Sequence, residues 1–298
     1  MDLETLETFV EVADTGGISQ AAQRLGVSKS IVSRRLSRLE AELGTQLLAR
    51  NTRGAALTEA GATFREHAAR VCAEIDSARE AILPDGPLRG RLRVAVPVSF
   101  GPTFAPMLAQ MARRHPGLTL QTCYSDRFVD LIGEGFDCGI RVGYLPDSNL
   151  VIAKRIGPVY TSLVASPGYL KTHGAPQAPE ALGEHQALMQ GTETWQFLDG
   201  DKVVTGHPQG RFKADNGRAL VDAAVAGLGI AYLPDCLVQE HLNSGALVPI
   251  MTDYPPPPAG AYVVRLPGQH PARKIRLLTE LLIELFGESL HAPAPVAR

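Results

Sequence analysis

Residues 18–39 read ISQAAQRLGVSKSIVSRRLSRL, two short amphipathic helical patterns on either side of a single glycine. The first pattern carries one apolar stripe, formed by Ala21, Ala22 and Leu25. Gly26 supplies the tight turn, and Ser28 is placed to cap the helix that follows. The apolar residues of the second pattern recur at helical spacing, at Val32, Leu36 and Leu39. This arrangement predicts a helix-turn-helix.

The second helix presents a polar face opposite its apolar stripe. Short hydroxyl groups and long cations share this face, and these are the side chains that reach base edges and phosphates of DNA. Seven lysines and arginines against two glutamates give a net charge of +5 over residues 24–53. A solvated cationic face is the alternative interpretation of such a run. We predict DNA contacts from Ser28, Lys29, Ser30, Ser33 and Arg34.

The segment after this helix predicts a wing and a long helix. Residues 46–57 are typical of a short hairpin with Arg50 and Arg53 at its tip, where they reach the minor groove or flanking phosphates. Residues 63–82 repeat apolar positions every three or four residues and predict an amphipathic helix with one apolar seam. A second copy of the chain is the expected cover for this seam, in a dimer that binds two half-sites. Packing within its own domain is the alternative.

Length and composition predict an ordinary globular chain with room for two or three domains: 298 residues, 45% hydrophobic and 20% charged. No apolar run reaches membrane-spanning length, and the first four residues, MDLE, lack the cationic start of a signal peptide. We therefore expect a cytoplasmic protein without a membrane partner. Four scattered cysteines, at positions 72, 123, 138 and 236, indicate reduced thiols, with a redox pair of Cys123 and Cys138 as the alternative.

Residues 83–87, LPDGP, mark a hinge, and beyond it short apolar runs alternate with helical patterns. The predicted strands cover residues 92–96, 118–123, 138–142, 160–165, 229–233 and 261–266. The predicted helices cover residues 103–114, 127–134 and 219–226. Such alternation predicts an α/β domain with parallel sheets.

Ligands of such sheets bind beyond the carboxyl ends of the strands, so the residues that follow each strand are the candidate site. Ser99 precedes a helix, and its hydroxyl with nearby free N–H groups can hold a carboxylate or another anion. The remaining candidates lie in the later turns. For Asn216, and for Asp126 in the turn of residues 124–127, a plain helix cap is an equally good interpretation. The predicted effector-binding residues are Ser99, Phe100, Tyr124, Arg127, Gly143 and Asn216.

Catalytic and cofactor motifs are missing from the sequence. It contains no G-x-S-x-G, no H-E-x-x-H and no G-x-x-x-x-G-K, and residues 133–135, GEG, lack the third glycine of a dinucleotide fingerprint. The eight histidines show no metal-ligand spacing. We expect no catalytic residue, no metal and no cofactor, and therefore a binding module.

Nearly the whole chain resembles a LysR-type transcriptional regulator. The run FVEVADTGGISQAAQRLGVSKSIVSRRLSRLEAELGTQLLARNTRGAALTEAG, residues 9–61, is similar to the DNA-binding half of that family. Residues 125–143, SDRFVDLIGEGFDCGIRVG, and 223–234, AAVAGLGIAYLP, are similar to its effector-binding half, as are residues 253–258, DYPPPP. Lys29-Ser30 departs from the glutamine followed by proline or serine of many members.

The resemblance implies an N-terminal all-α winged helix-turn-helix and a two-lobed α/β effector domain like the type 2 periplasmic binding proteins. It also implies a homotetramer, a dimer of dimers, that bends double-stranded promoter DNA and responds to a small effector in the cleft between the lobes. The expected domains are residues 1–60, the linker helix and hinge 61–88, and the effector domain 89–298. Lobe I takes 89–160 and 267–290, and lobe II takes 161–266.

We therefore predict a sequence-specific DNA-binding regulator controlled by a small organic effector, and no enzyme. An organic acid and an aromatic compound both fit the predicted site, which mixes arginines with aromatic side chains. Two other classes stay open: an enzyme fused to a DNA-binding domain, and an architectural protein without a ligand.

Overall fold

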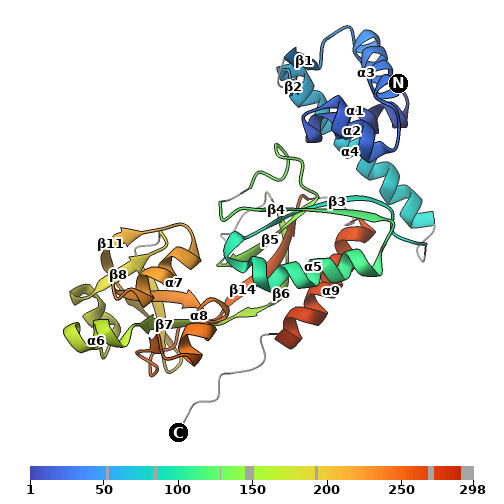
Figure 1. Cartoon of the computed structure of the whole chain (residues 1–298). Helices are drawn as coiled ribbons and strands as arrows, with labels where there is room; N and C mark the ends of the chain where they lie inside the picture. The colour runs from blue at the N-terminus through green and yellow to red at the C-terminus, as the bar shows by residue number, and fades with distance from the viewer. Residues whose placement is uncertain are drawn as a thin grey trace. The chain divides into compact units, whose positions relative to one another are not determined.

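The computed structural model describes residues 1–51, 54–82, 86–127, 129–144, 151–191, 194–267 and 272–289. Within these ranges no helix is long and apolar enough to cross a membrane. The chain divides into two compact units. The first unit consists of Met1–Gly90 with the short segments Ile132–Gly135 and His270–Arg273, and the second contains the rest. Figure 1 shows both units and labels their helices and strands where there is room.

The first unit is a helical domain with a two-stranded wing. Its elements are α1 (Leu3–Thr15), α2 (Ile18–Leu25), α3 (Lys29–Leu43), β1 (Leu48–Asn51), β2 (Gly54–Leu57) and α4 (Glu59–Ile82). Strands β1 and β2 pair antiparallel. Gly26 ends α2 with φ of 65°, a left-handed conformation that glycine adopts without a Cβ clash. The predicted helix-turn-helix and wing are therefore confirmed as structural elements.

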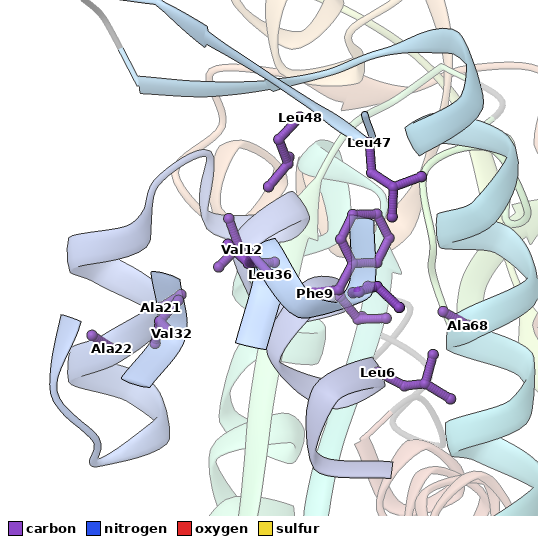
Figure 2. Packing of buried hydrophobic residues seen from close by; sticks show 12 residues of the cluster. Leu6, Phe9, Val12, Ala21, Ala22, Val32, Leu36, Leu47, Leu48 and Ala68 are labelled. Atoms are coloured by element: carbon purple, nitrogen blue, oxygen red, sulfur yellow. The ribbon is translucent and has the colours of Figure 1, made fainter. Parts of the chain in front are cut away.

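A single core holds this unit together (Figure 2). Apolar side chains of α1, α2, α3, the start of the wing and α4 converge there, among them Leu6, Phe9, Val32, Leu36 and Leu47. Phe9 is fully buried, and its ring centroid lies 5.4 Å from that of Phe64 on α4. Burying such an aromatic ring contributes about 2–3 kcal/mol, so this contact fixes α4 against α1.

The burial of the apolar seam of α4 decreases along the helix. Phe64 and Ala68 pack into the core of their own domain, so the alternative interpretation, packing within the domain, holds for this half of the seam. Farther along, Val71 is 45% exposed and Ile82 is 78% exposed. The uncovered part of the seam is therefore its C-terminal half.

The second unit contains two lobes, each built on a five-stranded sheet (Figure 1). Lobe I has the strand order β4-β3-β5-β14-β6. The strands are β3 (Gly90–Val96), β4 (Leu118–Tyr124), β5 (Cys138–Gly143), β6 (Ile152–Val159) and β14 (Ala259–Arg265). The helices are α5 (Gly101–Arg114) and α9 (Arg273–Ser289), joined by the stacked rings of Phe104 and Phe286 at 5.5 Å. A short 3-10 turn, η1 (Val98–Phe100), separates β3 from α5.

Lobe II has the strand order β11-β8-β12-β7-β13. The strands are β7 (Thr161–Ala165), β8 (Gln186–Met189), β11 (Gln209–Lys213), β12 (Ile230–Pro234) and β13 (Val248–Pro249). Helices α7 (Gly217–Val225) and α8 (Asp235–Asn243) share one core with Val164 of β7. The neighbouring Leu163 and Ala165 face the opposite core, as the two-residue period of a strand requires. That core also holds α6 (Pro167–His173), η2 (Pro179–Glu184) and the hairpin of β9 (Trp195–Asp199) and β10 (Lys202–Gly206).

Three features of this unit differ from the sequence expectations. Both sheets are mixed: β3 and β5 are parallel, but β14 is antiparallel to β5 and to β6. Strand β14 therefore belongs to lobe I, whereas the predicted lobe II ran to residue 266. The helix predicted over 127–134 is also wrong, because the described residues 131–135 form hydrogen-bonded turns. Two glycines in this segment, Gly133 and Gly135, make a helix costly there.

Candidate functional site

Helix α3 begins at a serine cap that fixes its direction. Ser28 Oγ accepts a hydrogen bond from the backbone N–H of Ile31 at 3.4 Å and lies 2.8 Å from Ser30 Oγ. Val32, Leu36 and Leu39 are buried, as predicted. The opposite face leaves Lys29, Ser30 and Arg34 exposed and Ser33 partly exposed. We call Ser28, Lys29, Ser30, Ser33 and Arg34 the recognition face.

The cations around α3 divide into paired and unpaired groups. Arg35 bonds to Glu4 and, at 3.1 Å, to Thr8, while Arg24 donates to Glu11 at 3.1 Å. Arg38 donates to Glu42 at 3.0 Å. In the part of the chain that the structure describes, Lys29 and Arg34 form no ion pair. The positive charge left for an external phosphate or guanine therefore lies on the recognition face.

Glu40, which the sequence identifies only as a negative charge, connects the wing to α3. Glu40 Oε1 accepts hydrogen bonds from the backbone N–H groups of Leu47 at 2.8 Å and Leu48 at 3.1 Å. This contact sets the start of β1 relative to the end of α3. Arg50 lies in β1 opposite Ala55, and Arg53 lies outside the described residues.

A second cluster of polar groups lies where the two lobes meet. Ser99 occupies η1, at the end of β3, and Asp126 follows β4. The backbone N–H of Ser125 donates to the carbonyl oxygen of Val96 at 2.9 Å, which holds the two turns of lobe I together. Ser99 donates to Asp126 twice, from its backbone N–H to Oδ1 at 3.2 Å and from its hydroxyl to Oδ2 at 3.1 Å.

Lobe II contributes the start of α7 to this cluster. Asn216 caps α7, because its Oδ1 accepts from the backbone N–H of Ala219 at 3.2 Å. Its Nδ2 donates to Oδ2 of Asp126 at 3.0 Å, and the backbone N–H of Gly217 donates to Ser99 Oγ at 3.0 Å. We call Ser99, Asp126, Asn216 and Gly217 the interlobe cluster.

The structure brings only two of the six predicted effector residues, Ser99 and Asn216, into this cluster. Phe100 is buried, with its ring 6.3 Å from that of Phe104, so its side chain lies in the core of lobe I. Tyr124 is 40% exposed at the end of β4.

The other two predicted residues lie in neighbouring turns. Arg127 is exposed, and its carbonyl oxygen accepts from Arg141 Nη1 at 3.0 Å. Burial lowers the pKa of this Arg141. Gly143 ends β5 opposite Gly260. Two surface hollows of lobe II, of 470 Å³ beside α6 and 270 Å³ beside β8 and β11, are not lined by any of the six.

The four cysteines are free thiols, and two of them, Cys138 and Cys236, lie in environments that disfavour the thiolate. Burial raises the pKa of Cys236 to about 11, opposed by a hydrogen bond with Thr103. Burial also raises the pKa of Cys138, which is completely covered. Because the thiolate is the reactive form, a redox role for Cys138 is disfavoured. Among the described residues no cluster of three or more potential metal ligands occurs.

Two family models match the chain. "Bacterial regulatory helix-turn-helix protein, lysR family" matches residues 3–62, and "LysR substrate binding domain" matches residues 85–287. An HTH-type transcriptional regulator of Xanthomonas campestris pv. campestris is 34% identical over 95% of this chain and 85% of that protein. The regulator CrgA of Neisseria meningitidis serogroup C is 32% identical over 96% of this chain and 98% of that protein.

Solved full-length structures agree. The virulence activator AphB of Vibrio cholerae is 30% identical with a TM-score of 0.57, covering 95% of this chain and 99% of that chain. The structure of CrgA from Neisseria meningitidis is 31% identical with a TM-score of 0.56, covering 96% of this chain and 99% of that one. The chain therefore belongs to the LysR family of DNA-binding transcriptional regulators with an effector-binding domain, and it is not an enzyme.

Proposed function

We propose that this regulator recognises a specific promoter sequence and that a small organic effector, an organic acid or an aromatic compound, controls its binding. The recognition face carries the DNA part of the proposal, since Lys29 and Arg34 are exposed cations without a protein carboxylate among the described residues. Ser28, Ser30 and Ser33 supply short hydrogen-bonding groups beside them. Arg50 and Arg53 of the wing are the proposed contacts to the minor groove or flanking phosphates.

The interlobe cluster supports the effector part. Its hydrogen bonds join lobe I to lobe II, so a ligand that exchanges them for bonds to itself changes the balance between two lobe positions. We place the effector beside Ser99 and Asn216, with Phe100, Tyr124, Arg127 and Gly143 in the surrounding turns.

We also propose that the active species is a homotetramer, a dimer of dimers, on double-stranded DNA in the cytoplasm. The exposed C-terminal half of the α4 seam is the surface that favours pairing of two copies. Two copies related by a twofold axis place two recognition faces on successive half-sites.

The test of the whole proposal is a footprint of the purified protein on DNA upstream of its own gene, at fixed salt. Each compound of a panel of organic acids and aromatics is added in turn. A protected twofold site whose extent shifts with one compound supports both parts. Diffuse protection that no compound changes supports an architectural protein instead.

Substitution Arg34→Ala is expected to weaken operator binding by about 5- to 160-fold, because the contact of an arginine with a base edge contributes about 1–3 kcal/mol. Gel-shift titration at several salt concentrations measures the loss. Arg113→Ala removes an equally exposed arginine of α5 in lobe I and serves as the matched control. Equal affinities of the two variants would contradict the recognition face.

A further inference from the structure

The carboxylate of Asp126 lies where hydrogen-bond donors of both lobes converge in the interlobe cluster. Three hydrogen bonds reach it from both lobes: from Ser99 N–H and Ser99 Oγ in lobe I, and from Asn216 Nδ2 in lobe II. Charge-assisted bonds of this kind are stronger than neutral ones. A side chain of the protein thus makes the contacts that Ser99 and the start of α7 offer to a ligand carboxylate.

We propose that Asp126 is an internal ligand of the interlobe cluster and a specificity-determining residue of the effector site. It occupies the carboxylate position beside Ser99, so an effector binds next to Asp126 through a hydroxyl or amino group, and an organic acid binds there through such a group and not through its carboxylate.

The donors of the cluster are already in use. Of the four donor groups, Ser99 N–H, Ser99 Oγ–H and one Asn216 N–H point to Asp126, and Gly217 N–H points to Ser99 Oγ. A carboxylate from outside would have to break these bonds and lie beside a like charge, and both effects weaken binding.

An acceptor position of the cluster is still open. A carboxylate accepts about four hydrogen bonds, and only three reach Asp126 from the cluster. The open position is on Oδ1, which receives the single bond from the Ser99 N–H. A hydroxyl or ammonium group of an effector donates to this oxygen without displacing any bond of the cluster.

The absence of a side chain at residue 217 lets the lobes approach closely enough for this arrangement. A Cβ at Gly217 would lie 3.3 Å from Ser99 Oγ and 2.8 Å from Leu237 Cδ1. The contact with Ser99 is the one between lobes, and a Cβ there would require a shift of a few tenths of an ångström, whereas the closer contact is with a side-chain end of lobe II itself. The internal ligand therefore depends on a contact between lobes and not on Asp126 alone.

The choice of effector group rests on the proposed function, whereas the internal ligand itself does not. An experiment without any effector separates the two. Asp126→Ala removes the carboxylate and leaves a vacant position with its donors in place. Formate and acetate, supplied as sodium salts, are the probes that fit this vacancy.

We expect formate to raise the thermal unfolding midpoint of D126A saturably, relative to sodium chloride at the same ionic strength. For a ligand of three non-hydrogen atoms, the tightest binding to expect has a dissociation constant on the order of 1 mM. The titration therefore runs to about 100 mM. At a tenfold excess over this constant the midpoint rises by roughly 3–6 °C.

Four controls isolate the position. The wild-type chain and Asp222→Ala, which removes an exposed carboxylate of α7, are expected to respond to formate no more than to chloride. Asp126→Asn fills the same volume and is also expected not to respond. The double variant D126A with Ser99→Ala is expected to lose the response because it lacks a donor.

Equal responses of wild-type protein and D126A to formate would overturn the proposal, as would no response of a folded D126A. If D126A does not fold in chloride, recovery of folded protein is compared in acetate and in chloride, and equal recovery overturns the proposal as well.

The effector panel then tests the ligand class with matched compounds such as benzoate, benzyl alcohol and benzylamine. A shift with the alcohol or the amine at lower concentration than with the acid is expected. A preference for the acid refutes the class. A footprint that no compound changes refutes the proposed function but not the formate result.

Discussion

At the scale of single residues, the sequence predicts the turn in which a polar residue lies better than it predicts the hydrogen-bond partners of that residue. The sequence indicates Ser99 and Asn216, the two residues that the structure brings into the interlobe cluster, because each follows a strand and precedes a helix, a local pattern. For Asp126 a helix cap is an equally good prediction, since its partners Ser99 and Asn216 are 27 and 90 positions away in the chain. The sequence predicts Phe100 in the site because it follows Ser99 in the same turn, but its ring packs on Phe104. Contacts between lobes depend on tertiary packing, which no local pattern contains.

Asp235, the first residue of α8, gives a pH prediction at this scale. Burial raises its pKa, opposed by the hydroxyl of Ser162, which donates to Oδ1 at 2.7 Å. A raised pKa in the folded state means that the folded protein binds the proton more tightly than the unfolded chain does. The stabilisation is complete below the unfolded pKa of about 3.9 and is lost as pH rises through the folded value.

Asp235→Asn mimics the protonated form at every pH. We therefore expect its unfolding free energy to exceed that of the wild type increasingly as pH rises from about 4 to 7. Urea unfolding across this range measures the difference. A difference that is constant or shrinks with rising pH would contradict the assigned direction.

At the scale of elements, periodic segments were predictable and the strand partners were not. The helix-turn-helix was readable because both of its helices carry a regular apolar stripe around one glycine. The segment after Asp126 has a similar stripe, but Gly133 and Gly135 leave it as turns. The apolar sequence of β14 fits the sheet of either lobe. The sequence therefore does not predict that this strand lies between β5 and β6.

Glu40 provides the element-scale prediction, since it links α3 to the wing. Leu47 and Leu48 are 1% and 8% exposed, so losing the carboxylate leaves two buried N–H groups without that acceptor. Each costs about 1–3 kcal/mol, and we expect Glu40→Ala to lower the unfolding free energy by roughly that amount or more. Urea unfolding measures this cost, and gel-shift titration measures an accompanying loss of operator affinity.

Glu40→Gln is the matched control because its amide oxygen still accepts hydrogen bonds. We expect it to retain most of the stability and of the affinity. If the alanine and glutamine variants lose stability equally, the charge of Glu40 matters and the link to the wing does not.

At the scale of the whole molecule, the exposed half of α4 leads to a prediction about assembly. Val71→Glu keeps a good helix former but places a charge on the apolar seam. If two copies cover the seam, the charge is buried in the interface, and we expect the dissociation constant of the assembly to rise at least about tenfold. Analytical ultracentrifugation across a concentration series measures the change.

Glu74→Gln alters an exposed residue one turn along α4 and serves as the control. Circular dichroism checks that both variants stay folded. An unchanged mass distribution for Val71→Glu would assign assembly to another surface.

The place of β14 also sets the order in which the lobes are completed during synthesis. Lobe II is one continuous stretch of chain from β7 to β13, whereas the sheet of lobe I lacks a central strand until Ala259–Arg265 has been made. At about 5–20 residues per second, the hundred residues between Val159 and Ala259 take roughly 5–20 s to translate. During that interval β6 has no partner strand and one edge of β5 is open. All five strands of the lobe II sheet are therefore synthesised before lobe I can close, and the open strand edges of lobe I are the point at which a nascent chain is most exposed to aggregation and to chaperones.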